Sequence, residues 1–85
     1  LTRDATEYII DKGAVNFGVD NTSPDMWLDK TYPCHMVCRE RRVTHIENLC
    51  NLDKLVGKRF TFIALPLKIR GGTGSPLRAV AVLEG

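Results

Sequence analysis

The apolar residues of this chain occur only in short segments separated by turn residues, and this pattern constrains the fold more than any other feature. None of these segments approaches the roughly 18 apolar residues that a membrane-spanning helix requires. A chain of 85 residues can form one small domain at most, and a domain of that size buries only a modest share of its surface. We therefore expect residues 1–85 to be a single soluble domain, or part of one, that does not enter a membrane.

The first part of the chain predicts a helix followed by a strand. Thr2 can cap a helix over residues 3–12, and Gly13 is a typical stop signal. Residues 14–19 alternate apolar and smaller or polar side chains, as a strand does. Residues 20–25 are Asp, Asn, Thr, Ser, Pro and Asp, a composition typical of a turn-rich loop. Binding and catalytic residues often lie in such loops.

The rest of the chain predicts one more helix and three more strands. Pro33 suits the first turn of a helix over residues 34–41. Strands are expected at residues 43–47, at residues 59–65 and, with continuous apolar character, at residues 77–83. The second of these three should be buried. The order helix, strand, helix, strand, strand, strand predicts an α/β or α+β layer, and nothing in the sequence marks an interior linker.

Charge and cysteine content exclude several protein classes. Residues 1–30 carry six acids and three bases, whereas residues 31–85 carry nine bases and four acids. The bases cluster only at Arg39, Arg41 and Arg42, so the broad basic face of a nucleic-acid-binding protein is not expected. Three cysteines are an odd number, which argues against a secreted disulfide framework and favours the cytoplasm.

The chain begins with Leu-Thr-Arg-Asp. That start lacks the basic region and apolar stretch of a signal peptide. It also lacks an initiator Met. We therefore predict a processed chain or a fragment.

His35 and Glu47 are the first candidate pair for chemistry. His35 lies near a predicted helix start and Glu47 at the end of the next strand, and ends of this kind meet at loops. Imidazole and carboxylate together suit zinc, manganese or iron. On spacing alone, the favoured interpretation is that His35 caps or packs at its helix start and that Glu47 pairs with an arginine. His45, on the same face of its strand as Glu47, is a candidate for a supporting or substrate-facing role, or else a solvated histidine.

The cysteines offer two rival sites. Cys34, His35 and Cys38, with His45 and Cys50 further along the chain, could form a thiolate-rich structural zinc site, although the spacing is not that of a zinc knuckle. Cys38 could also serve as a nucleophile, but the sequence places no base beside it. Buried free cysteines commonly act as small apolar residues, and core packing is the interpretation we favour.

Residues 68–76 form a glycine-rich loop between two predicted strands. Lys68 and Arg70 add positive charge beside Gly71, Gly72 and Gly74. Glycines allow backbone amides to approach an anion. The loop lacks the Gly-Lys-Ser ending of a phosphate-binding P-loop, so a structural connection is the favoured interpretation, with a nucleotide or anion site as the alternative.

Several motifs, taken in order, resemble one family of proteins. The motifs are Val19-Asp20, Ser23-Pro24-Asp25, His35, Ile46-Glu47-Asn48-Leu49, Asn51-Leu52-Asp53 and the apolar and glycine-rich segment of residues 66–83. Together they resemble the C-terminal half of the cyclase family of metal-dependent hydrolases, which includes kynurenine formamidase. The resemblance implies half of a swivelling β/β/α domain. It also implies that the sheet lacks its N-terminal strands.

The resemblance implies a one- or two-metal site, with zinc or manganese the expected ion. His35 and Glu47 fall on the ligands that the C-terminal half of the family contributes. The other ligands belong to a His-x-Gly-Thr-His motif that this sequence lacks. The implied reaction is hydrolysis of a formamide, cyclic amide or lactone of a small molecule by a metal-activated water. The implied partners are an N-terminal companion segment or a second copy of the chain. The alternative is a non-catalytic, self-associating module.

Overall fold

The computed structural model describes residues 1–84 and divides into two compact units, Leu1–Cys50 and Asn51–Gly85. The elements follow the predicted order helix, strand, helix, strand, strand, strand, and the fold is the expected mixture of helices and strands. A short 3-10 helix, η1 (Leu52–Leu55), opens the second unit. Over residues 1–84, no helix has the length and apolar character needed to cross a bilayer.

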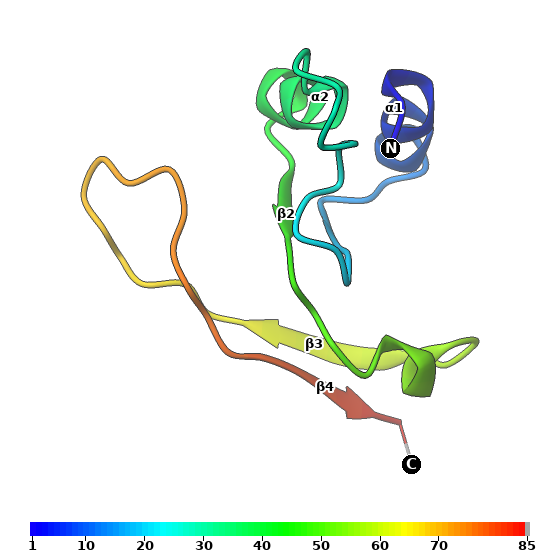
Figure 1. Cartoon of the computed structure of the whole chain (residues 1–85). Helices are drawn as coiled ribbons and strands as arrows, with labels where there is room; N and C mark the ends of the chain where they lie inside the picture. The colour runs from blue at the N-terminus through cyan, green and yellow to red at the C-terminus, as the bar shows by residue number, and fades with distance from the viewer. Residues whose placement is uncertain (85) are drawn as a thin grey trace. The chain divides into compact units, whose positions relative to one another are not determined.

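The first unit contains two helices and a small parallel sheet. Its elements are α1 (Arg3–Asp11), β1 (Asn16–Gly18), α2 (Pro33–Arg41) and β2 (Thr44–Ile46). Strand β1 pairs in parallel with β2, with Phe17 opposite His45, and α2 connects the two strands. Figure 1 shows α2 leading directly into β2. Both strands are shorter than the predicted ranges of residues 14–19 and 43–47. The alternating pattern of the sequence continues into residues whose backbone pairs irregularly, and these residues do not count as strand.

Irregular pairing extends the parallel ladder past the end of β1. The amide of Val19 donates to the carbonyl of Ile46, and the amide of Leu49 donates to the carbonyl of Val19. The amide of Asn48 donates to the carbonyl of Asn21. These bonds hold the start of the turn-rich loop against the segment that carries Glu47.

Helices α1 and α2 pack against each other over a small core. Ile10 of α1 lies in this core with three residues of α2, namely Cys34, Val37 and Cys38, and Val37 is fully buried. Two ion pairs join the helices at their exposed sides: Arg3 to Glu40 at 2.6 Å and Arg41 to Asp11 at 2.8 Å. Thr2 caps α1 by accepting a hydrogen bond from the amide of Ala5, as the sequence predicted.

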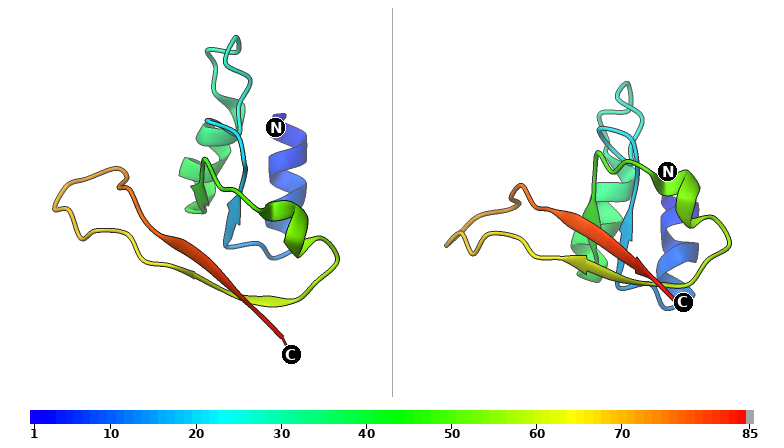
Figure 2. Two further views of the ribbon diagram at one scale, coloured as in Figure 1. Left: turned by 60° about the horizontal axis from the view of Figure 1, so that its bottom comes forward. Right: turned by 90° about the horizontal axis from the view of Figure 1, so that it is seen from below.

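The second unit contains an antiparallel ribbon of β3 (Phe60–Ala64) and β4 (Ala79–Leu83). Figure 2 shows the two strands side by side in both views, joined by the long loop that includes the glycines. We expected β3 to be buried, but Phe60, Phe62 and Ile63 are 37–39% exposed. A two-stranded ribbon cannot bury either of its faces by itself, so the apolar pattern of β3 is not matched by burial in this unit.

Candidate metal centre

His35 lies in the first turn of α2. Pro33 is at the start of the helix, and Tyr32 precedes it in the left-handed conformation with φ of 48°. Cys34, which follows Pro33, points into the core and is fully buried. The adjacent His35 side chain therefore points away from the core, and it is 38% exposed.

His45 and Glu47 reach the same place from β2 and from the residue just after it. Side chains two residues apart on a strand point to the same face, which explains why the two lie together. The His45 ring stacks on Phe17 of β1 with ring centroids 5.8 Å apart, and its side chain is only 15% exposed. The Glu47 side chain is 31% exposed, so the pair lies half-buried at the end of the small sheet.

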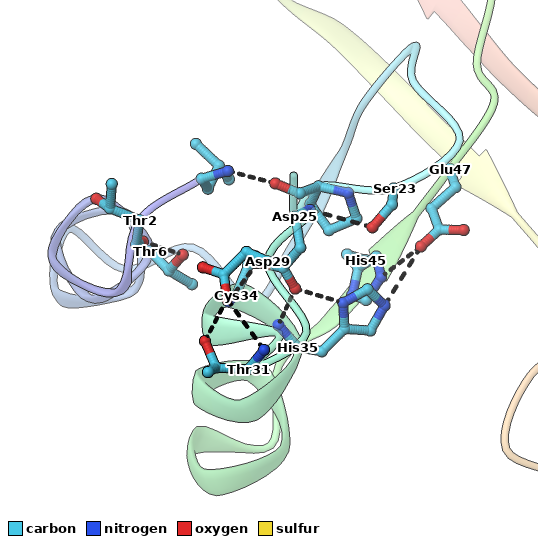
Figure 3. Close-up of polar contacts among 12 residues, drawn as sticks. Thr2, Thr6, Ser23, Asp25, Asp29, Thr31, Cys34, His35, His45 and Glu47 are labelled. Carbon is cyan, nitrogen blue, oxygen red and sulfur yellow. Dashed lines mark hydrogen bonds and ion pairs between the residues drawn. The ribbon is translucent and has the colours of Figure 1, made fainter. Parts of the chain in front are cut away.

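The three side chains converge on one carboxylate oxygen. Oε1 of Glu47 lies 3.4 Å from Nε2 of His35 and 3.1 Å from Nε2 of His45. The two imidazole rings meet edge to face with centroids 4.7 Å apart. One possible ligand atom from each residue lies within 4.8 Å of the other two. Figure 3 shows the two rings turned toward Glu47.

Asp25 contacts the opposite side of the His35 ring. Its carboxylate Oδ2 lies 2.6 Å from Nδ1 of His35 and accepts a 3.0 Å hydrogen bond from the backbone amide of His35. Oδ1 accepts a 2.7 Å bond from the amide of Cys34. Burial opposes the ionisation of Asp25, but the hydrogen bonds from His35 and Cys34 outweigh it, and the pKa of Asp25 is lowered overall.

This group of donors is compatible with a divalent metal ion. Within residues 1–84, His35, His45 and Glu47 are the only set of three possible ligands that gathers in this way. Two imidazoles and a carboxylate form a donor set that zinc and other transition metals accept. The carboxylate also supplies negative charge, which a cation would offset.

The structure brings together the three candidate residues that the sequence offered, namely His35, His45 and Glu47. The ion-pair partners of Glu47 among residues 1–84 are the two histidines, so the interpretation of Glu47 as an arginine partner is wrong. The thiolate site is not formed in the described chain, since Cys34 and Cys38 lie in the core. Burial raises the pKa of Cys38 to about 11, which makes it a poor nucleophile at neutral pH.

Sequence reasoning does not single out Asp25, which it assigns only to a turn within the Ser-Pro-Asp motif. The signal that could have identified it is an acidic residue in a loop beside a helix start that lacks its own capping side chain, since Tyr32 makes no side-chain cap. Its contact with His35 depends on how the loop folds back over α2, which no local pattern in the sequence specifies.

Comparison with known proteins gives consistent matches along nearly the whole chain. It is 37% identical over 86 aligned positions to isatin hydrolase of Roseibium aggregatum, an alignment that covers 96% of this chain and 33% of that protein. It is 39% identical to kynurenine formamidase of Paracidovorax citrulli, covering 91% of this chain and 35% of that protein. It is 35% identical to kynurenine formamidase of Bacillus mycoides, covering 94% and 38%.

The chain is homologous to proteins named kynurenine formamidase and isatin hydrolase. The resemblance inferred from the ordered motifs is thereby confirmed. The chain spans about a third of the length of these relatives. No family model matches the chain, and no solved structure matches it significantly. All the named relatives carry the names of hydrolases, so the cluster of His35, His45 and Glu47 lies in a chain related to hydrolytic enzymes.

Proposed function

We propose that this chain supplies part of the active site of a metal-dependent hydrolase that cleaves the amide bond of a small molecule. The observation that carries the proposal is the convergence of His35, His45 and Glu47 on one point, in a chain homologous to kynurenine formamidases and isatin hydrolase. A formamide and isatin both present an amide carbonyl. We therefore propose a formamide, cyclic amide or related lactone as the substrate class.

We assign His35 and Glu47 as metal ligands, with zinc or manganese as the ion. The Nε2 atom of His35 and Oε1 of Glu47 face each other at 3.4 Å, so one cation between them would contact both. Zinc and manganese each accept imidazole together with carboxylate. Such an ion supplies polarisation of a substrate carbonyl and acidification of a coordinated water.

We assign His45 to the support of Glu47. Its Nε2 lies 3.1 Å from the same carboxylate oxygen, and stacking on Phe17 fixes the plane of the ring. A hydrogen bond from His45 would hold the Glu47 carboxylate toward His35 and limit its rotation. A substrate-facing role is the alternative for His45, 15% of whose side chain is exposed.

We propose that the remaining ligands come from a companion segment of the same protein or from a second copy. Two ligands do not hold a metal firmly, and catalytic zinc sites generally use three protein ligands. The β3–β4 ribbon supports the proposal of a further segment or chain that packs against it, because both faces of the ribbon carry exposed apolar side chains. These are Phe60, Phe62 and Leu83 on one face, and Ile63, Val80 and Val82 on the other. The buried thiols of Cys34 and Cys38 support the cytoplasm as the compartment.

The test of this function is an activity assay on the native protein. Isatin and an N-formyl aromatic amine are offered with added zinc or manganese, and the product is followed by absorbance. We expect turnover that His35→Ala and Glu47→Ala each reduce at least 100-fold, an order of magnitude typical of lost metal-site or catalytic groups. Glu84→Gln is the control, because Glu84 is exposed and its contact with Arg59 is long, at 4.0 Å. Equal activity in all four proteins would reject the assignment.

The exposed ribbon also favours a second candidate, a non-catalytic interaction module. An apolar β-ribbon with open edges can pair with another chain. In that case Phe62→Lys and Val82→Lys would abolish association while metal binding would be absent from the wild-type protein. Sedimentation velocity together with metal analysis separates the two candidates, since only the hydrolase requires both a bound metal and a loss of that metal on mutation of His35.

A further inference from the structure

We propose that Asp25 is a positioning residue that fixes the His35 ring with its proton on Nδ1 and the lone pair of Nε2 facing Glu47. The metal-ligand role of Nε2 rests on the function proposed above. The proton position does not, and it can be tested in the protein without metal. The proposal follows from three features of the Asp25 carboxylate: its burial, its set of donors and its position at the start of α2.

Burial fixes Asp25 in one orientation. Its side chain is only 1% exposed, so its oxygens cannot exchange their partners for water. The Ser23 hydroxyl accepts a 3.1 Å hydrogen bond from the Asp25 amide, which restrains the backbone of the same residue. Figure 3 shows the carboxylate between the start of α2 and the His35 ring.

The hydrogen-bond donors around the Asp25 carboxylate determine whether Nδ1 of His35 carries a proton. Oδ1 accepts from the amide of Cys34, and Oδ2 accepts from the amide of His35. An ionised carboxylate has no proton to donate. The 2.6 Å contact between Oδ2 and Nδ1 therefore requires that Nδ1 carries the proton. A neutral imidazole with Nδ1 protonated has its lone pair on Nε2.

The other end of the ring shows why this tautomer matters. Nε2 of His35 faces Oε1 of Glu47 at 3.4 Å. With the proton on Nδ1, both of these atoms are acceptors, and a cation between them turns a repulsive pair into two attractive ones. If the proton moved to Nε2, it would point at Glu47 and occupy the position that an ion needs. Asp25 thus keeps the metal-facing side of His35 open.

The Asp25 carboxylate binds both the His35 ring and the first backbone amides of α2. Tyr32 at the N-cap makes no side-chain capping hydrogen bond, and Asp25, nine residues before Cys34, satisfies two of the first amides of α2 instead. A carboxylate in this place is favoured by the positive end of the helix. The same three hydrogen bonds therefore fix the backbone that carries His35 and the direction of its ring.

Asp25→Asn is the variant that tests the role of the charge. Asparagine keeps the shape of the side chain but replaces one acceptor oxygen by an amide that only donates. If that amide faces Nδ1, the proton of His35 must move to Nε2. Asp29→Asn is the matched control. Asp29 lies in the same loop and accepts hydrogen bonds from the amide and hydroxyl of Thr31, away from the His35 ring.

The experiment records long-range ¹H–¹⁵N spectra of the histidines in the native protein at a pH of about 8, above the ordinary pKa of a histidine, with metal removed by a chelator. In the wild type and in Asp29→Asn we expect the His35 signals to show a protonated Nδ1 and an unprotonated Nε2. In Asp25→Asn we expect the reverse or a mixture. A protonated Nε2 in the wild type would overturn the proposal, as would an unchanged pattern in Asp25→Asn. If Asp25→Asn does not fold, the wild-type spectrum alone still decides.

Zinc affinity, measured by competition with a chromogenic chelator, provides the second readout. We expect Asp25→Asn to weaken zinc binding about 10- to 100-fold, as losses of a carboxylate behind a ligating histidine do, and Asp29→Asn to leave it unchanged. A wild-type protein with the expected tautomer but no zinc binding would refute the proposed function and leave the role of Asp25 intact. Zinc binding that is equal in wild type and Asp25→Asn would refute the role of Asp25 alone.

Discussion

Nδ1 of His35 lies 2.6 Å from Oδ2 of Asp25, and Nε2 of the same ring lies 3.4 Å from Oε1 of Glu47. The ring is thus held between two carboxylates of different character. Asp25 is 1% exposed at its side chain and Glu47 is 31% exposed. The buried carboxylate orients the ring, and the half-exposed one remains able to share a cation.

The substitution His45→Phe should weaken metal binding without unfolding the protein. The introduced phenyl ring would keep the stacking on Phe17 seen for His45 at 5.8 Å, but it would lose the 3.1 Å contact with Glu47. We expect metal affinity to fall about 10- to 100-fold, the range for a group that orients a ligand. Isothermal titration with zinc measures the affinity, and circular dichroism monitors the fold. Unchanged affinity would show that His45 does not support Glu47.

Shortening Val37 should destabilise the first unit. The Val37 side chain is fully buried, so Val37→Ala leaves a small cavity in the core between α1 and α2. We expect a loss of about 1–3 kcal/mol in the free energy of unfolding, measured by urea denaturation. Val15→Ala is the matched control, because Val15 is 80% exposed and its change should be within about 0.5 kcal/mol. Equal losses in both variants would contradict the assigned core.

Acid should weaken the connection between α1 and α2 that Arg3 and Glu40 provide. The hydrogen bond from Arg3 at 2.6 Å, with its positive charge, lowers the pKa of Glu40 below its ordinary value of 4.5. Because the folded protein lowers the pKa of Glu40, this carboxyl contributes to the free energy of unfolding above pH 4.5, its ordinary pKa. That contribution is lost as the pH falls through the lower pKa that Glu40 has in the folded protein.

Urea denaturation of wild type and Glu40→Gln at two pH values checks this prediction. We expect wild type to be the more stable protein at pH about 6 and the difference between the two midpoints to shrink as the pH falls below 4.5, because the lowered pKa of Glu40 lies there. The pair is exposed, so the difference should be small and should shrink further in high salt. A difference that grows toward low pH would have the wrong sign and would reject the role of this ion pair.

The three cysteines should differ in their reactivity. Cys38 is buried, and its pKa of about 11 leaves on the order of 0.1% thiolate at pH 8. Cys50 is exposed. With iodoacetamide in the native protein, we expect Cys50 to be alkylated first and Cys38 only after unfolding in urea, as followed by peptide mass spectrometry. Rapid native alkylation of Cys38 would contradict its burial and restore it as a candidate nucleophile.

The elements of the fold could largely be predicted from local sequence signals. Thr2 and Gly13 mark the two ends of α1, and Pro33 marks the start of α2; each acts through the chain within a few residues of itself, so the sequence shows it directly. Strand ends were less well predicted. Strand β1 runs only from Asn16 to Gly18, because a strand ends where its partner ends, and the partner lies far along the chain.

The site itself could be predicted only in part. His45 and Glu47 share a strand face, so period-two alternation was enough to place them together. His35 joined them only through family resemblance, since its approach depends on the packing of α2 beside β2. Asp25 was not predicted, because its three hydrogen bonds to α2 arise from the path of a whole loop. The burial expected of β3 is absent because it requires neighbours that the unit does not contain.

Zinc titration of the native protein, together with the companion segment or second copy that completes the site, tests most directly whether His35 and Glu47 hold a metal ion. Wild type, His35→Ala, Glu47→Ala and the control Glu84→Gln are compared by isothermal titration at neutral pH. We predict saturable binding in wild type and Glu84→Gln, and a loss of at least 100-fold in affinity in both ligand variants, since each removes a direct ligand. Binding of equal strength in all four proteins would contradict the claim.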